Sequence, residues 1–203
     1  MLNFRFYIAI LSTSLMMLLS GGSLYGQHMA INDEQSHLWI EGKSNVNSFS
    51  CDANQYELNS QRLAPALETE TPTTENLQVE ISIQVKGFDC GKKRMNRDLL
   101  DALKADQYDS IHYEYQSTED VEYDEESDIY RIIINGILTV AGQSNNIQLS
   151  MNGYLMDENI RAKGKTEIIM TNYNVEPPTA MFGLVRVNNT LTVHFDLTAA
   201  IVE

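Results

Sequence analysis

Two cysteines and four histidines are the side chains of this sequence best suited to nucleophilic or metal chemistry. A catalytic thiol needs a neighbouring histidine and an oxyanion hole, and nothing in the sequence brings such groups to Cys51 or Cys90. A metal site needs at least three converging donors, and the histidines are scattered without a His-x-His spacing. We therefore expect neither a catalytic cysteine nor a metal site. The histidines are His28, His37, His112 and His194.

Catalytic signatures are also missing. The sequence has no Gly-x-Ser-x-Gly element, no phosphate-binding loop and no dinucleotide fingerprint. A pair of carboxylates can act as acid and base, but the numerous Asp and Glu residues fall in expected loops or on the polar faces of expected strands. We therefore expect a protein that is not an enzyme and that has no cofactor.

The charge balance is acidic, with 28 Asp and Glu residues against 14 Lys and Arg residues and a net charge of −14. Nucleic acid is therefore a poor partner, because phosphate binding needs clustered cations. Much of the acidic excess lies in residues 119–128, which we interpret as a solvated loop. The basic cluster Lys92, Lys93 and Arg94 follows the end of an expected strand. It is suited to contact a lipid headgroup, and a solvated basic turn is the alternative.

The elements that must position these groups are mostly strands. Apolar and polar residues alternate from Leu77 to Val85 and again from Leu191 to Ile201. A strand with this pattern has one apolar and one polar face, which is typical of antiparallel barrels and sandwiches. The apolar faces either line a cavity or pack into a closed core. The candidate cavity-lining residues are Val79, Ile81, Ile83, Val85, Ile147, Leu149, Met151, Leu191, Val193, Phe195 and Leu197.

One short helix is expected near residues 95–105. Met95, Leu99, Ala102 and Leu103 recur at helical spacing, and Asn96 is suited to the N-cap position. The helix lies between two long strands. Leu99 and Leu103, together with Phe182, are therefore candidates for a lid over the mouth of a barrel.

The N-terminal segment has the layout of a secretory signal peptide, with Arg5, an apolar run and then small residues. The run is shorter than the ~20 residues of a membrane-spanning helix. We expect cleavage, no stable membrane span afterwards, and a periplasmic or secreted protein. An oxidising compartment and an even cysteine count favour a Cys51–Cys90 disulfide. The expected divisions are a signal peptide at 1–26, a short leader at 27–36 and one domain at 37–203.

The domain is expected to be mainly β, a single antiparallel barrel of about eight strands. Eight strands leave an interior just wide enough for side chains or for one slim ligand. The first strand is expected over 37–51, with a bulge or bend at Gly42. The pair Asn188 and Asn189 predicts a tight turn, and 61–75 predicts a long loop.

Three stretches resemble the YceI-like family of polyisoprenoid-binding proteins. Residues 39–49 are similar to the family's opening strand, where a small residue and a Val precede a Phe. Residues 135–142 resemble its Gly-x-Leu-Thr-hydrophobic-x-Gly signature, and the order strand, short helix, strand lies between them. The sequence departs from the family near 170–178, which has no Arg and no Phe-Gly. The resemblance covers 38–202 and implies an extended, lipocalin-like barrel that holds an isoprenoid or similar lipid.

These observations predict a binding protein that sequesters or carries a lipid with a long hydrocarbon chain. The alternative is a structural or interaction module whose barrel has a filled core and whose outer face meets a partner. The sequence leaves a homodimer open.

Overall fold

A computed structural model of the chain describes residues 28–62, 77–156 and 159–202. Within these ranges the protein has twelve strands and one α-helix, α2 (Lys93–Ala102). Three 3-10 helices accompany them: η2 (Asp33–Gln35), η4 (Val85–Gly87) and η5 (Met170–Tyr173). The strands are β1 (His28–Ile31), β2 (His37–Ser44), β3 (Ser48–Ala53), β4 (Tyr56–Arg62), β5 (Leu77–Gln84), β6 (Phe88–Asp89), β7 (Ser110–Asp124), β8 (Ile129–Val140), β9 (Gln143–Met156), β10 (Asn159–Ile169), β11 (Thr179–Ala180) and β12 (Val185–Val202).

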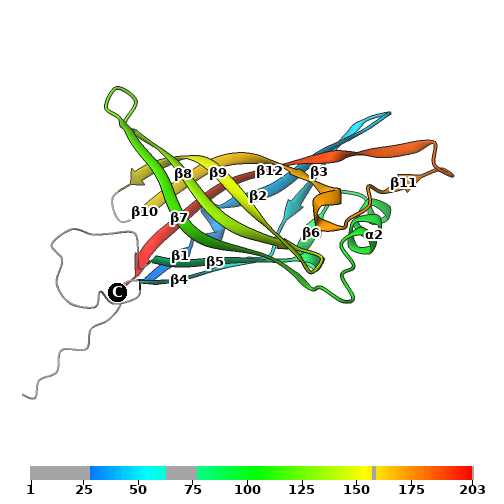
Figure 1. The fold of residues 1–203 in the computed structure, drawn as a ribbon, viewed down its shortest axis with the longest axis horizontal. Coiled ribbons are helices and arrows are strands. Elements are labelled where there is room, and N and C mark those ends of the chain that lie inside the picture. The colour runs from blue at the N-terminus through cyan, green and yellow to red at the C-terminus, as the bar shows by residue number, and fades with distance from the viewer. Residues whose placement is uncertain (1–27, 63–76, 157–158, 203) are drawn as a thin grey trace, which may run out of the picture.

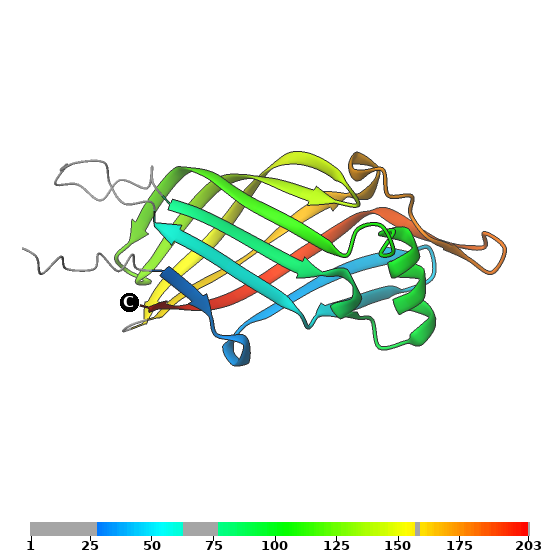
Figure 2. The same ribbon diagram turned by 90° about the horizontal axis from the view of Figure 1, so that it is seen from below.

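The strands form one antiparallel sheet that curls into a half-barrel (Figures 1 and 2). Its order is β4-β5-β7-β8-β9-β10-β12-β2-β3-β6. The longest strand, β12, also pairs with β1 and β11. The curl brings β1 against β4. The expected mainly β, antiparallel barrel is therefore confirmed, but the strand count is higher than eight.

The opening strand is a hairpin rather than one bent strand. β2 ends at Ser44 and β3 begins at Ser48, and the backbone N–H of Ser44 donates to the carbonyl of Asn47 at 2.8 Å. The Ser44 hydroxyl donates to the same carbonyl at 3.0 Å. Gly42 pairs directly with Phe49 across this hairpin. The glycine therefore lets the Phe49 ring approach the backbone of β2, and it does not form a bulge.

The acidic run 119–128 was wrongly expected to be a loop. Most of it extends β7, which pairs with β8 as far as Asp124 opposite Ile129. The turn is confined to residues 125–128, where the Asp124 carboxylate accepts from the backbone N–H groups of Glu126 and Ser127 at 3.1 and 3.3 Å. A capped turn and a strongly β-forming partner strand together outweigh the charge repulsion.

Three other expectations differ from the structure. Asn188 and Asn189 form no turn, because β12 runs through them with a register shift against β2 between Val187 and Leu191. The segment expected as a leader contains β1. The helix begins at Lys93 with Lys92 at the N-cap position, so Asn96 lies inside it. The signal peptide and the loop over 63–75 lie outside the described residues.

Candidate functional site

A cavity of about 640 Å³ lies inside the curled sheet. Ten of the eleven candidate residues line it, and the exception is Val85. The alternation of β5 ends at Gln84, and Val85 begins η4, where it is 1% exposed within the protein core. The candidates that line the cavity are Val79, Ile81, Ile83, Ile147, Leu149, Met151, Leu191, Val193, Phe195 and Leu197.

The middle of this interior is hollow. On β9 the outward-facing residues are exposed, whereas the inward-facing Ile147, Leu149 and Met151 are only half-buried. In a closed core these apolar side chains would be fully buried, because protein interiors leave few voids larger than a water molecule. Buried clusters do occur, one around Val85 and Leu103 and another around the β2–β3 hairpin, but they leave the central lumen open.

Three glycines of the inner wall each lie against an aromatic ring. A Cβ atom built at any of three inward-facing glycines would overlap a ring from a neighbouring strand. Each ring therefore occupies the space that a side chain at the glycine would take. Sequence reasoning missed these pairs, although each glycine occupies a position that would hold an apolar residue in the alternation of its strand. The pairs are Gly42 with Phe49, Gly136 with Tyr113, and Gly164 with Phe195.

Tyr113 places a polar atom on this apolar wall. The residue is 7% exposed, and its hydroxyl has no hydrogen-bond partner among the described residues. Burial, assisted by the neighbouring Tyr115, raises the pKa of Tyr113 to about 12. The phenol therefore stays protonated, and less than 1 Å² of its oxygen is accessible. By contrast, the hydroxyls of Tyr115 and Thr118, which also line the cavity, bond to each other at 2.9 Å.

The helix α2 closes one end of the hollow (Figures 1 and 2). Its candidate lid residues Leu99 and Leu103 both line the cavity, as does Met95. Leu103, which caps the helix, is 8% exposed within a buried cluster, so this end of the helix is packed in place.

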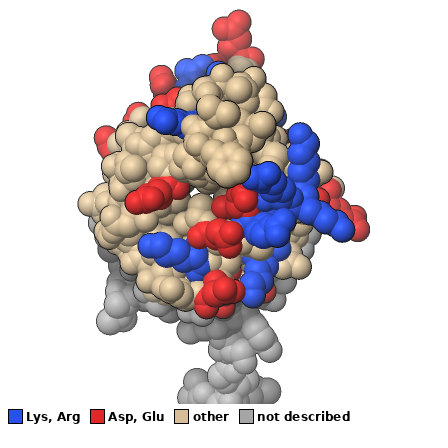
Figure 3. Space-filling model, turned by 90° about the vertical axis from the view of Figure 1, so that its right-hand side faces the viewer, with Lys and Arg blue, Asp and Glu red and all other residues tan. Residues whose placement is uncertain are grey.

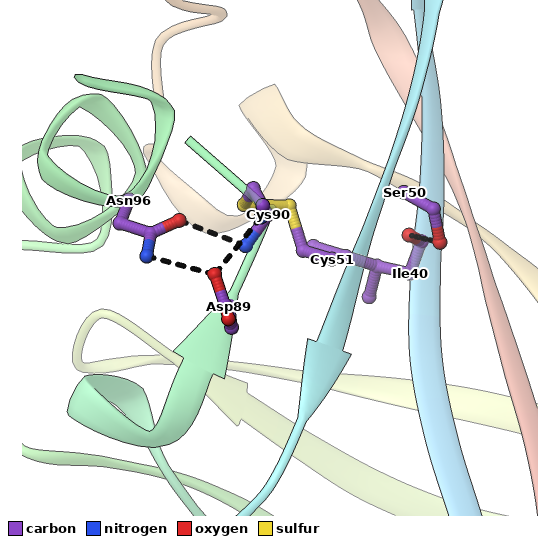
Figure 4. Close-up of a disulfide and its surroundings, with 7 residues drawn as sticks. Ile40, Ser50, Cys51, Asp89, Cys90 and Asn96 are labelled. Atoms are coloured by element: carbon purple, nitrogen blue, oxygen red, sulfur yellow. Dashed lines mark hydrogen bonds between the residues drawn. A yellow bond between two sulfur atoms is a disulfide. The ribbon is translucent and has the colours of Figure 1, made fainter. Parts of the chain in front are cut away.

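The other end of α2 is fixed by a disulfide, as the sequence predicted. Cys51 on β3 bonds to Cys90, just before the helix (Figure 4). The side-chain oxygen of Asn96 accepts from the backbone N–H of Cys90 at 2.8 Å, and its amide donates to the Asp89 carboxylate at 3.0 Å. This bond from Asn96, together with one from the backbone of Gly91, lowers the pKa of Asp89. Asn96 thus ties the helix to the disulfide segment.

The basic headgroup candidates lie at the start of α2 but do not line the cavity. Lys92, Lys93 and Arg94 are all exposed. Arg94 approaches the carboxylate of Asp98 at 3.8 Å, and it is Asp98 that lines the cavity. The cations are therefore placed outside the hollow, at the same end of the molecule.

Phe182 is not part of a lid. It is fully exposed at the turn between β11 and β12 and does not line the cavity. The segment just before it does, through Pro178, Thr179 and Ala180. The hairpin projects away from α2 instead of folding over it (Figure 1), because β11 pairs with β12 and not with any strand on its other side.

The other polar side chains do not converge on a reactive centre. The described residues hold no group of three His, Cys, Asp or Glu side chains that could bind a metal ion. His112 bonds to Glu80 at 3.2 Å, and His194 stacks on Trp39 with ring centroids 4.7 Å apart. Both histidines are on strand positions opposite to the lining residues, where they support the outer face of the sheet.

In its described part the protein has no helix with the length and hydrophobicity needed to cross a bilayer. A search of curated proteins found no match to this chain.

Solved structures share the fold at low sequence identity. The chain resembles BcnA of Burkholderia cenocepacia with 16% identity and a TM-score of 0.63, over 84% of this chain and 99% of the other. A polyisoprenoid-binding domain from Saccharophagus degradans has 12% identity and a TM-score of 0.65, over 86% and 98%. A YceI protein of Campylobacter jejuni has 14% identity and a TM-score of 0.56, over 75% and 84%.

The sequence itself matches the family described as the YceI-like domain over residues 29–199. This match spans the curled sheet, the helix and the cavity they enclose, from β1 to most of β12. The chain belongs to the YceI-like family.

Proposed function

We propose that this protein binds one lipid with a long hydrocarbon chain, of the isoprenoid class, in the central cavity. The observation that carries the proposal is the hollow itself, whose wall is built almost entirely from aliphatic and aromatic side chains. Burying apolar surface is worth about 0.8 kcal/mol per CH₂ group, so a long chain needs no strong polar contact to bind. The polyisoprenoid-binding domain from Saccharophagus degradans, which shares the fold, supports the choice of ligand class.

The size of the cavity suits a chain and not a bulky solute. Its volume of about 640 Å³ falls in the usual range for small-molecule sites, ~300–1,000 Å³. The lining extends from Ile31 on β1 to Pro178 before β11, so the space runs along the barrel.

We further infer that the protein acts by sequestration, without catalysis or a cofactor, and that it works in the periplasm or after secretion. The Cys51–Cys90 disulfide supports an oxidising compartment. Held in the cavity, a chain that is insoluble in water would be shielded during transfer between membranes.

The test is organic extraction of the purified protein, followed by mass spectrometry and by rebinding of a fluorescent isoprenoid to the delipidated protein. A co-purifying lipid near equal stoichiometry, displaced by the fluorescent probe, is the expected result. An empty extract together with no uptake of the probe would favour the rival function, a β-barrel module that meets a partner through its outer face.

A further inference from the structure

The hairpin of β11 and β12 ends in a group of exposed apolar side chains, which we call the finger tip. Met181, Phe182 and Leu184 are 60%, 108% and 73% exposed, and Val46 of the neighbouring β2–β3 turn is 65% exposed. The hairpin projects beyond α2 at one end of the barrel (Figures 1 and 2). Four large apolar residues at the end of a projection are unusual, since exposed apolar patches mark interaction sites.

The finger tip is an ordered structure. The backbone N–H of Asn45 donates to the carbonyl of Arg186 at 3.1 Å, and the Asn45 amide donates to the carbonyl of Leu184 at 2.9 Å. These bonds join the β2–β3 turn, which carries Val46, to the β11–β12 hairpin. The Arg186 guanidinium also donates to the carbonyl of Gly183 at 3.0 Å, inside the turn.

The backbone of this turn directs its side chains outward. Met181 and Phe182 have φ angles of 51° and 57°, and Gly183 follows at 84°. Met and Phe rarely adopt this left-handed conformation, and such residues cluster where function requires them. The turn therefore holds two unfavourable conformations and presents its largest ring, Phe182, wholly to solvent.

Positive charge gathers at the start of α2, near the finger tip. Residues 92–97 contain four cations, Lys92, Lys93, Arg94 and Arg97, and no acid, in a chain with a net charge of −14. Figure 3 faces this end and shows Lys and Arg side chains, with Asp and Glu side chains among them, beside a protruding surface without charged side chains. The acidic β7–β8 turn lies at the other end of the barrel (Figure 1).

We propose that the finger tip inserts into the surface of a bilayer containing anionic lipids, with the start of α2 facing the headgroups. Aromatic and aliphatic side chains beside Lys and Arg are the combination that binds to such a surface. A stable protein interface needs about 800 Å² from each partner, whereas four side chains on a narrow hairpin suffice to anchor in lipid. This proposal does not depend on what the cavity holds.

The geometry also connects the finger tip to the cavity. Thr179 and Ala180 of β11 and Val185 of β12, at the base of the hairpin, line the cavity, and so does Met95 of α2. A molecule docked by its finger tip would therefore present this apolar rim, and not the acidic end, to the membrane.

The test is flotation of the full chain with vesicles of phosphatidylcholine, with and without phosphatidylglycerol. We expect binding to the anionic vesicles that weakens in high salt, because exposed charges are screened. Phe182→Ser with Leu184→Ser should lower vesicle binding at least tenfold. The matched control is Val121→Ser with Leu155→Ser, which removes two apolar residues with exposed fractions of 53% and 64% at the other end of the barrel and should leave binding unchanged.

Insertion can be followed directly with Phe182→Trp and quenching by brominated lipid, using Trp39, the one natural tryptophan, as the background. The proposal is overturned if wild type does not bind anionic vesicles, or if the finger-tip double variant binds them as wild type does. It is also overturned if that variant instead abolishes self-association of the wild-type protein. The lipid content of the purified double variant should equal that of wild type, which separates this proposal from the function of the cavity.

Discussion

A single bulky residue in the lumen tests whether a chain lies along its length. Leu149 faces Ile134 across β9 and β8, and both residues line the cavity. A volume of about 640 Å³ holds roughly twenty CH₂-sized groups, if each takes about the ~30 Å³ of a water molecule. Leu149→Trp should obstruct the middle of this space. Excluding even five carbons would cost about 4 kcal/mol, which corresponds to a roughly thousandfold loss of affinity.

The assay is competition of geraniol and geranylgeraniol against a fluorescent isoprenoid, with folding monitored by circular dichroism. Wild type should prefer the longer alcohol, and Leu149→Trp should lose this preference while still binding the shorter one. The control is Ser150→Trp, since Ser150 is exposed on the outer face of the same strand. If Leu149→Trp is folded and binds the longer alcohol as tightly as wild type does, the ligand does not lie along the lumen.

Three further predictions concern the disulfide, the buried phenol and the outer face. Cys51→Ser with Cys90→Ser, which opens a loop with a sequence separation of 39, should lower the free energy of unfolding in urea by up to about 4 kcal/mol. Tyr113→Phe should leave ligand affinity unchanged in the same competition assay and should raise the free energy of unfolding by about 1 kcal/mol, because it removes a buried hydroxyl that has no hydrogen-bond partner among the described residues. On the outer face, hydrogen bonding from Arg161 lowers the pKa of Asp196. The ionised carboxylate therefore stabilises the fold above its unfolded-state pKa, and this contribution is lost as the pH falls through the folded-state pKa. Asp196→Asn should lower the free energy of unfolding by about 1 kcal/mol at pH 7 and should make that free energy depend less on pH in the acid range.

Local patterns in the sequence predicted the features that depend on neighbouring residues. The alternation of Leu191 to Ala199 gave the inward face of β12 correctly, because the side-chain period of a strand is a local property. The same rule failed at Val85, where the chain leaves the sheet and enters η4. The pairing of Cys51 with Cys90 was predictable because the chain offers no other cysteine.

Features set by distant residues could not be predicted in this way. Alternation shows which face of a strand is apolar, but it does not show whether the apolar faces of different strands fill the interior or leave a cavity. The outcome depends on contacts between strands, such as the contact of Gly164 on β10 with the ring of Phe195 on β12. Asn189 looked like a turn residue, yet its side chain bonds to Thr171 of η5 at 2.8 Å and lies within β12. Phe182 was assigned to a lid by its place in the sequence, although its hairpin projects outward.

The helix α2 is attached at both of its ends where it closes the cavity. Its first turn is tied through Asn96 to the segment that carries Cys90, and its last turn is held by the buried Leu103. A ligand that entered by lifting the helix would have to break both attachments. Met95 in the first turn of the helix and Ala180 at the base of the β11–β12 hairpin both line the cavity. We therefore expect a ligand to enter between α2 and the base of the β11–β12 hairpin, at the end of the barrel that we propose meets the bilayer.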